Sequence, residues 1–485
     1  MITFDVMAPL MFGGLIVFML FGYPVAFSLA AVGLSFGFIS IKLGFFGFDL
    51  LQALPLRVFG IMANDLLLAI PFFTFMGTIL ERCGLAEDLL DAMGQLFGPV
   101  RGGLAYAVIM VGAVLGAITG TVAASVIAMG LISLPIMQRY GYDMKLATGV
   151  IAASGTITQL IPPSLVLVVL ADQLGRSVGD LYAGAIGPSI VQVVLFCAYI
   201  VGVSFVKPEW VPPVPKEFRT ITGWRLVWKC TWGMVPSLVL IFLVLGTIFM
   251  GLATPTEAGA MGAVGAMVLA AMHARLTWPL VWQGMQTTMR ISSMVIFILI
   301  GSTVFTLVFR GVDGDLWIEG LMSHLPGGNV GFLIFVNIFV FFLAFFLDFF
   351  EIAFIIIPLL APIAAKLGID LIWFGVLLCV NMQTSFMHPP FGFALFYLRG
   401  IAPPSVKSSD IYWGAFPWVF LQIMMAAILI FWPGLVTYWI DKGPAVDLKS
   451  IEIQMENQED QDNPTSEDIE KGLEGGGQAQ PAPAK

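Results

Sequence analysis

The chain has 485 residues, of which 59% are hydrophobic and 11% are charged, and its mean hydropathy is +0.94. Soluble domains carry roughly 25% charged residues, so this composition excludes an ordinary soluble protein and indicates an all-α polytopic membrane protein. Much of the net charge of −9 comes from the polar stretch 441–485, which is predicted to be disordered. Nucleic acid is not an expected partner because no basic stripe occurs, whereas membrane lipid is.

Apolar runs that approach the roughly 20 residues of a membrane span recur along the chain. In order they fall at about 7–22, 24–41, 66–82, 103–135, 147–171, 184–206, 232–252, 254–273, 291–310, 330–364, 371–398 and 412–440. The two longest runs have polar residues at their middle, and we interpret both as re-entrant hairpins. Two amphipathic stretches, Phe48 to Asn64 and Thr277 to Arg290, are predicted to be helices at the membrane interface, with connecting loops as the alternative.

A Pro-Pro pair with polar neighbours interrupts two of these runs, at 156–164 and at 383–391. Proline removes a backbone donor and pushes the preceding residue out of the helical region. At membrane depth, the freed carbonyls are tolerated only where they are buried in protein or line a cavity. Paired breaks of this kind mark the binding site of secondary transporters, so the sequence predicts two broken helices that build a transport site.

Landmarks recur in the same order in the two halves of the chain. Four pairs are offset by 231, 224, 228 and 227 residues: Pro24 and Pro255, Gly77 and Gly301, Gly120 and Asp348, Pro162 and Pro389. These offsets predict a first repeat at 1–206, with its hairpin at about 103–135 and its broken helix at about 147–171. A connector at 207–231 would lead to a second repeat at 232–440, with a hairpin at about 330–364 and a broken helix at about 371–398.

Basic residues predict the orientation, since they favour the cytoplasmic side. Arg101, Arg139 and Lys145 flank the first hairpin and five more basic residues lie in the connector, whereas 325–329, before the second hairpin, contains none. The two hairpins are therefore expected to enter from opposite faces as an inverted repeat, with both termini periplasmic. Four basic residues depart from this pattern: Lys42, Arg176, Arg310 and Lys366.

Two carboxylates lie in the second hairpin. A charged group inside a span costs about 2.5–3.5 kcal/mol on insertion scales and is usually paired or functional. Asp348 and Glu351 are three residues apart, so both can face one side of a helix end. Two interpretations stay open at this point: the carboxylates are ligands for Na⁺, or Asp348 caps the second helix of the hairpin.

The remaining candidate ligands are hydroxyls, amides and backbone groups at the hairpin centres and the breaks. Na⁺ is a hard cation that takes oxygen ligands, and helix N-termini after the breaks favour an anion. With the two carboxylates, the predicted Na⁺ and substrate site comprises Thr119, Gly120, Thr121, Ser125, Ser154, Thr156, Thr158, Pro162, Pro163, Asn381, Thr384, Ser385, His388, Pro389 and Pro390. Hydroxyls also serve packing in membrane helices, and His388 is a substrate contact, a proton relay or a core residue.

Over about residues 5–440 the chain resembles the large membrane subunit (DctM type) of tripartite ATP-independent periplasmic (TRAP) transporters. The matching motifs are Ile70-Pro71-Phe72-Phe73 with Gly77, Gly155 to Ser164, Pro255-Thr256-Glu257-Ala258-Gly259-Ala260, and the second Pro-Pro pair with Gly392. The resemblance implies an elevator-type transporter of organic acids in the bacterial inner membrane, driven by Na⁺ as coupling ion and without another cofactor. It further implies two partners, a small four-helix membrane subunit and a periplasmic solute-binding protein.

The sequence departs from the family pattern at two places. The first hairpin reads Thr119-Gly120-Thr121-Val122 where Ser-Gly-Ser-Ser is usual, and His388 stands where threonine is usual. At these two positions the chain resembles the branch of the family that is associated with 2-oxo acids, chloroaromatic acids and mannitol. The alternative function is a stand-alone Na⁺-coupled organic anion symporter of the divalent-anion type. An enzyme is not expected, because the sequence contains no metal-ligand cluster and no nucleophile–base motif.

Overall fold

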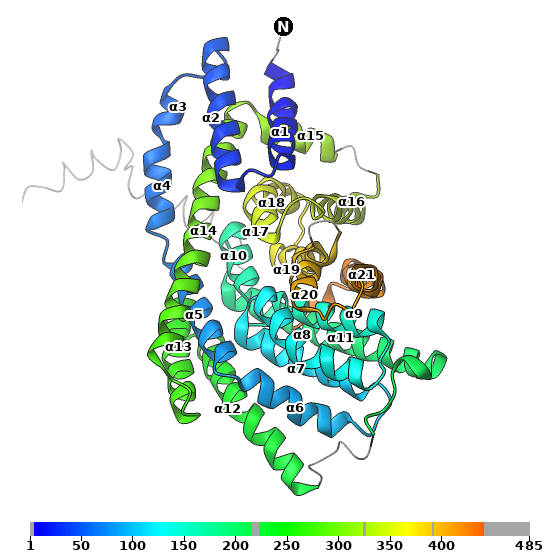
Figure 1. The fold of residues 1–485 in the computed structure, drawn as a ribbon. Coiled ribbons are helices and arrows are strands. Elements are labelled where there is room, and N and C mark those ends of the chain that lie inside the picture. Colours follow the sequence, from blue (N-terminus) through cyan, green and yellow to red (C-terminus); the bar gives the residue numbers. More distant parts are fainter. Residues whose placement is uncertain (1–3, 216–222, 324–325, 390–391, 441–485) are drawn as a thin grey trace, which may run out of the picture. The chain divides into compact units, whose positions relative to one another are not determined.

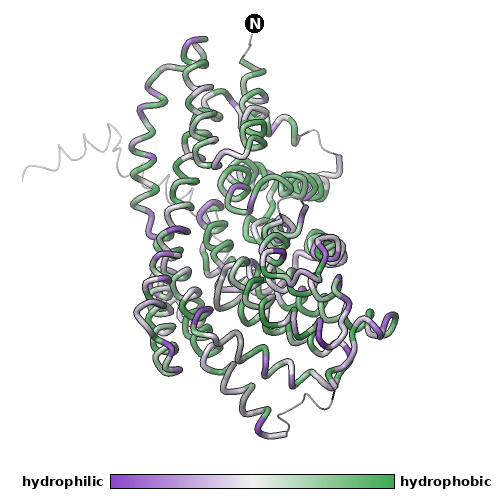
Figure 2. Tube along the Cα trace, viewed as in Figure 1, coloured by the Kyte–Doolittle hydropathy of each residue, from purple (hydrophilic) through white to green (hydrophobic). Residues whose placement is uncertain are grey.

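A computed structural model describes residues 4–215, 223–323, 326–389 and 392–440. All regular structure in these ranges is helical (Figure 1). Eight of the described helices are long and apolar enough to cross a membrane, or nine if the bent pair Asp49–Met62 and Asp65–Arg82 forms one span. Hydrophobic residues predominate along the tube in Figure 2, with hydrophilic residues interspersed. The predicted all-α polytopic membrane fold is thereby confirmed.

The two halves of the chain follow the same succession of elements. The first half contains α1 (Phe4–Leu20), α2 (Val25–Leu43), α3 (Asp49–Gln52), α4 (Leu54–Met62), η1 (Asp65–Leu68), α5 (Ala69–Arg82), α6 (Leu85–Phe97), α7 (Gly103–Thr119), α8 (Val122–Arg139), α9 (Met144–Thr156), η2 (Ile157–Gln159), α10 (Leu165–Leu174), α11 (Val178–Val206) and η3 (Pro208–Trp210).

The second half contains α12 (Trp224–Phe249), α13 (Pro255–Met272), α14 (Trp278–Gly311), α15 (Gly314–Ser323), α16 (Gly328–Leu343), α17 (Phe349–Glu351), the π-helix η5 (Ile352–Ile356), α18 (Ile357–Lys366), α19 (Leu371–Met382), η6 (Gln383–Met387), α20 (Phe393–Ile401), α21 (Ser408–Phe431) and α22 (Gly434–Thr437). In each half two helices precede a long or bent helix, a short helix, a hairpin, a broken helix and a closing helix. This order agrees with the duplication that the sequence predicts, which stays a prediction.

The predicted interface helix from Thr277 to Arg290 is wrong as a separate element. The segment forms the first part of α14, one continuous helix of 34 residues that begins directly after its N-cap residue, Thr277. At about 1.5 Å per residue this helix is about 51 Å long, well beyond a bilayer core. Amphipathic composition indicates a helix but does not show where the helix ends. Here α14 packs along α5, with Gly284 against Phe75 and Ile79.

The other amphipathic stretch, Phe48 to Asn64, forms α3 and α4 and is joined to α5 through η1 with a bend of 48°. Asn64 marks the bend, because its side chain caps η1 by accepting from the Leu66 amide at 3.0 Å. The connector also differs from the prediction. Helix α12 begins at Trp224, so the end of the predicted connector is helical, and Trp228 and Trp232 stack on one face of it.

The helices fall into two packed groups, and the first is built along α14 (Figure 1). Here α14 packs against α2 and α5, and α13 packs against α5 and α12. Glycine allows the backbones to approach: a Cβ built on Gly301 would lie 2.3 Å from the Ala26 carbonyl oxygen, and one on Gly33 would lie 3.0 Å from the Phe305 backbone. Small residues are the usual means of close packing between membrane helices.

The second group contains the hairpins α7–α8 and α16–α18, the broken helices α9–α10 and α19–α20, and the long helices α11 and α21. Both broken helices begin with an aspartate cap, Asp143 on α9 and Asp370 on α19. Helices α9 and α21 meet at glycines. A Cβ on Gly149 would lie 2.2 Å from the Gly414 carbonyl oxygen, and a Cβ on Gly414 would lie 2.1 Å from the Lys145 carbonyl oxygen.

The contact between α9 and α21 predicts that Gly414→Ala destabilises the protein by about 1–3 kcal/mol, because the added methyl group meets backbone that cannot move aside. Gly246→Ala on α12 is the matched control, since a Cβ there meets nothing within 4 Å and alanine has the higher helix propensity. Thermal unfolding of the purified protein in detergent should show a lower midpoint for the first variant only. Equal midpoints for the two variants would refute this packing.

Candidate functional site

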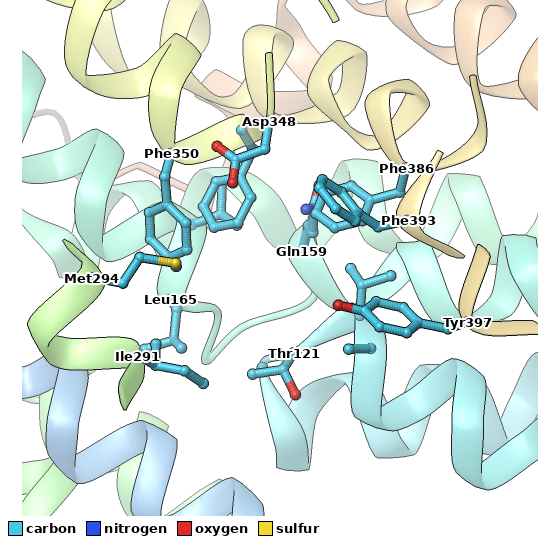
Figure 3. A pocket seen from close by; sticks show the side chains of 15 residues that line it. Thr121, Gln159, Leu165, Ile291, Met294, Asp348, Phe350, Phe386, Phe393 and Tyr397 are labelled. Atoms are coloured by element: carbon cyan, nitrogen blue, oxygen red, sulfur yellow. The ribbon is translucent and has the colours of Figure 1, made fainter. Parts of the chain in front are cut away.

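One cavity of about 250 Å³ is lined by both hairpins and both broken helices (Figure 3). Its walls are Gly120, Thr121, Val122 and Ala123 of the first hairpin, Gln159, Leu165 and Val166 of the first broken helix, Asp348, Phe349 and Phe350 of the second hairpin, Phe386, Phe393 and Tyr397 of the second broken helix, and Ile291 and Met294 of α14. Segments from the two halves of the chain therefore meet around one space.

Three glycines spaced by four residues bring the first hairpin onto the first broken helix. A Cβ built on each would lie 2.7 Å from Ser154 Cβ for Gly112, 2.9 Å from Thr158 Cα for Gly116 and 3.6 Å from Leu165 Cγ for Gly120. Gly120 also has a φ of 60°, a conformation that favours glycine. It ends α7 there and allows α8 to begin at Val122, so the hairpin tip lies against the break.

Aromatic packing brings the second hairpin onto the second break. The ring of His388 stacks on Phe345, with centroids 4.2 Å apart, and meets Phe341 edge-on at 4.4 Å. Phe349 and Phe386 continue this contact with centroids 6.0 Å apart. His388 is thus a buried packing residue, and its predicted roles in substrate binding or proton transfer stay predictions.

Asp348 and Glu351 form a reciprocal capping box. The Glu351 amide donates to the Asp348 carboxylate at 2.9 Å, and the Asp348 amide donates to the Glu351 carboxylate at 3.0 Å. The structure therefore shows the cap, one of the two interpretations of Asp348. Because its carboxylate carries two oxygens and lines the cavity, it can also offer an oxygen to a cation.

Most of the predicted hydroxyls lie behind the cavity wall. Four of them donate to carbonyls of their own segments: Thr156 to Ala153 at 2.9 Å, Thr158 to Gly155 at 2.9 Å, Thr384 to Asn381 at 2.7 Å and Ser385 to Met382 at 2.7 Å. Ser125 and Ser154 are fully buried on α8 and α9. The four hydrogen-bonded hydroxyls satisfy backbone carbonyls at the breaks, and none of the six lines the cavity.

The prolines shape the breaks and do not line the cavity. Pro162 and Pro163 are buried and joined by a cis peptide bond, and Pro389 is exposed. Pro390 and the side chain of Thr119 lie outside the described residues. Of the described candidates, the structure thus brings Gly120, Thr121 and Asp348 together on the cavity wall.

Asn381 bridges two elements of the second half. Its amide donates to the Asn337 carbonyl oxygen at 2.7 Å and to the Asn337 side-chain oxygen at 2.9 Å, which ties α19 to α16. A second buried bridge joins the two halves of the chain, where the Gln422 amide of α21 donates to the Thr156 hydroxyl of α9 at 2.8 Å. Asn381 therefore holds α19 against α16, a structural role that the sequence did not indicate.

Gln159 is a wall residue that the sequence analysis missed. It lies within the first break, at the end of η2, and is only 1% exposed. Neither the nitrogen nor the oxygen of its side-chain amide has a hydrogen-bond partner. Its backbone carbonyl accepts from the Ser164 hydroxyl at 2.5 Å. A polar glutamine within an apolar run could have indicated a site residue. Nothing in the sequence indicated that the aromatic residues, Ile291 or Met294 line the cavity.

The cavity wall contains few groups that carry charge or could bind an ion. Of the described residues that line the cavity, Asp348 alone carries a formal charge. Within the described ranges, no group of three or more His, Cys, Asp or Glu side chains is placed to hold a metal ion. Hydroxyl, carboxylate and unwound backbone oxygens can bind a hard monovalent cation, and the N-terminus of α8 faces the cavity, where it favours an anion.

The chain matches known proteins over most of its length. Residues 12–435 match the family model of the tripartite ATP-independent periplasmic transporter, DctM component. The C4-dicarboxylate TRAP transporter large permease of Pseudomonas aeruginosa is 30% identical over 405 residues, which cover 83% of this chain and 92% of that protein. The corresponding permease of Rhodobacter capsulatus is 28% identical over 448 residues, which cover 88% and 97%.

A solved structure shares the fold. The YdaH transporter of Alcanivorax borkumensis superposes with a TM-score of 0.57 at 14% identity, covering 80% of this chain and 88% of that one. At this identity the likeness concerns the fold alone.

The Asn381 bridge predicts that Asn381→Leu destabilises the protein by about 1–3 kcal/mol, because it leaves polar groups of Asn337 unpaired in a buried place. Replacing both partners by leucine should recover part of the loss, since no orphaned side-chain group then remains. Thermal unfolding of the single and double variants checks this. A double variant as unstable as the sum of the two single variants would contradict the bridge and favour a ligand role for Asn381.

Proposed function

Because the chain belongs to the DctM-component family of tripartite ATP-independent periplasmic transporters, we propose that it is the large permease subunit of a Na⁺-coupled, binding-protein-dependent importer of a small organic acid. The family consists of transporter permeases and not of enzymes. The observation that carries the proposal is the convergence of two hairpin tips and two helix breaks on one cavity. Secondary transporters bind their substrate and coupling ions at interrupted helices of this kind.

In the proposed mechanism, Na⁺ is held between each hairpin tip and its partnering break. Thr121 and the carbonyls freed at 157–164 serve the first ion, and Asp348 with the carbonyls freed at 383–388 serves the second. The acid lies between the two tips and is neutralised by the ions. Because the tips and breaks pack on each other, binding of ion and acid is coupled through the same backbone.

The transport movement is proposed to be an elevator. The hairpins and broken helices form one packed group, whereas α14 belongs to the other and supplies Ile291 and Met294 to the cavity wall. Movement of the hairpin group along α14 would carry the cavity from one face of the membrane to the other. The inverted repeat, at 1–206 and 232–440, would make the two end states nearly equivalent.

The remaining parts of the proposal rest on family membership. The chain is a multi-pass membrane protein, and we place it in the bacterial inner membrane with both termini in the periplasm. The relatives are named for C4-dicarboxylates, which supports an organic acid as substrate. The proposed partners are a small four-helix membrane subunit and a periplasmic solute-binding protein.

Reconstitution in liposomes tests the assignment against a stand-alone symporter of the divalent-anion type. We expect uptake of an organic acid along an inward Na⁺ gradient only when the small subunit and the binding protein are both present. Uptake by the purified chain alone would favour the stand-alone symporter. Uptake that is unaffected when the Na⁺ gradient is collapsed would contradict the proposed coupling.

For the coupling ion, Asp348→Asn and Thr121→Ala should each raise the Na⁺ concentration for half-maximal uptake by roughly tenfold or more, since a charge-assisted contact contributes about 1.5–3 kcal/mol. Asparagine caps helices about as well as aspartate, so Asp348→Asn removes the charge and keeps the cap. Asp370→Asn is the matched control, because Asp370 caps α19 with the same chemistry but does not line the cavity.

The comparison is made on initial uptake rates at varied Na⁺ concentration. Unchanged Na⁺ dependence in both site variants, or an equal shift in Asp370→Asn, would show that these residues do not bind the ion.

A further inference from the structure

Of the fifteen residues that line the cavity, five are aromatic and six are aliphatic, and Thr121, Gln159 and Asp348 are polar. Resting on the proposed function, we propose that the acid bound here is an aromatic monocarboxylate. Its carboxylate lies at the N-terminus of α8 beside Gln159, and its ring lies among the aromatic side chains of the second hairpin and the second broken helix. Gln159 and Phe393 then determine specificity, the first for the carboxylate and the second for the ring.

We place the carboxylate at the N-terminus of α8 because this N-terminus lacks the side-chain cap that α10 and α17 have. Ser164 caps α10 through the Val166 amide at 3.2 Å, and Asp348 caps α17 through the Glu351 amide at 2.9 Å. Helix α8 has 18 residues, and its N-cap residue Thr121 makes no capping hydrogen bond. Because Val122 and Ala123 line the cavity, the uncapped start of α8 presents its positive dipole end to a bound ligand.

Gln159 is the independent observation that points to a ligand in the same cavity. Its side chain is buried and lines the cavity, yet neither the amide nitrogen nor the amide oxygen has a partner. A buried amide without partners costs about 1–3 kcal/mol, so such groups are normally satisfied. A ligand carboxylate in the cavity can accept a hydrogen bond from this amide nitrogen and so satisfy it.

The aromatic side chains define the other part of the ligand. Figure 3 shows Phe350 and Met294 on one side of the cavity and Phe386, Phe393 and Tyr397 on the other. Rings in such walls pack well against a planar apolar body, in stacked or edge-on geometry. The volume of about 250 Å³ suits a small ligand of this shape.

Among the described residues that line this cavity, no cationic side chain is present to pair with a second carboxylate on the ligand. Of the described lining residues, Asp348 alone is charged, and its sign is negative, so it repels an additional anionic group. The cavity therefore favours one carboxylate with an apolar body over a dicarboxylate. An aromatic cage with a carboxylate also suits organic cations, which makes an organic cation the competing ligand in the test.

The test is ligand binding to the purified full-length chain in detergent, measured by thermal shift and by calorimetry. The probes are phenylacetate, succinate and benzylammonium, each in sodium chloride and in choline chloride at equal ionic strength. We expect phenylacetate to bind and stabilise the protein in sodium and more weakly in choline. Succinate and benzylammonium should give no stabilisation in either salt.

Two matched pairs of variants locate the ligand. Gln159→Met should weaken phenylacetate binding roughly ten- to hundredfold, the size expected for a lost hydrogen bond to a charged group. Its control is Gln192→Met on α11, where the amide is equally buried and also unpartnered but does not line the cavity. Phe393→Leu should weaken binding several-fold, whereas Phe396→Leu on the same helix, with a side chain 73% exposed, should not.

The outcomes separate this inference from the proposed function. Sodium-dependent binding of succinate without binding of phenylacetate overturns the aromatic class and leaves the transporter assignment intact. Binding of benzylammonium in both salts overturns the anion site. If neither acid binds in sodium, this inference fails, and the proposed function is decided separately by the uptake experiment in liposomes. Should Gln159→Met not fold, the Phe393 and Phe396 pair decides, and equal affinities in that pair overturn the inference.

Discussion

The structure depends on one constraint: a backbone that leaves the helical conformation at membrane depth must be buried in protein and satisfied there. At the first break this is achieved by side chains. The Ser164 hydroxyl donates to the Gln159 carbonyl oxygen, and the Ser189 hydroxyl of α11 donates to the Leu160 carbonyl oxygen at 3.2 Å. The thiol of Cys379, from the other half, also reaches the Gln159 carbonyl oxygen at 3.4 Å. The first break is thus held by elements from both halves of the chain.

Burial of this backbone requires close approach, and glycine provides it in the first half. The row Gly112, Gly116 and Gly120 lets the first hairpin lie directly on the broken helix, so the tip and the break share one wall. The second half reaches the same arrangement with aromatic rings, where His388 stacks on Phe345. The two hairpins are therefore packed onto their breaks by different residues, glycines in the first half and aromatic rings in the second.

Much of the fold could be predicted from the sequence because its signals are local. Proline pairs, polar residues within apolar runs and span lengths indicated the hairpins and the broken helices directly. The continuity of α14 could not be predicted, since it depends on packing along α5, and an amphipathic segment alone does not show whether the helix continues. Only part of the site could be predicted from the sequence, for the same reason.

Hydroxyls such as Thr158 and Thr384 lie in the breaks, but they turn back to carbonyls of their own segments. Gln159 and the aromatic wall face the cavity because of the relative placement of distant helices. The central claim is that both hairpin tips and both breaks form one shared site for ion and acid. The most direct measurement is an experimental structure of the protein with Na⁺ and a transported acid. We predict density for the acid between Thr121 and Asp348, with helices interrupted at 157–164 and 383–392. An acid bound elsewhere, or helices that continue through both regions, would contradict this account.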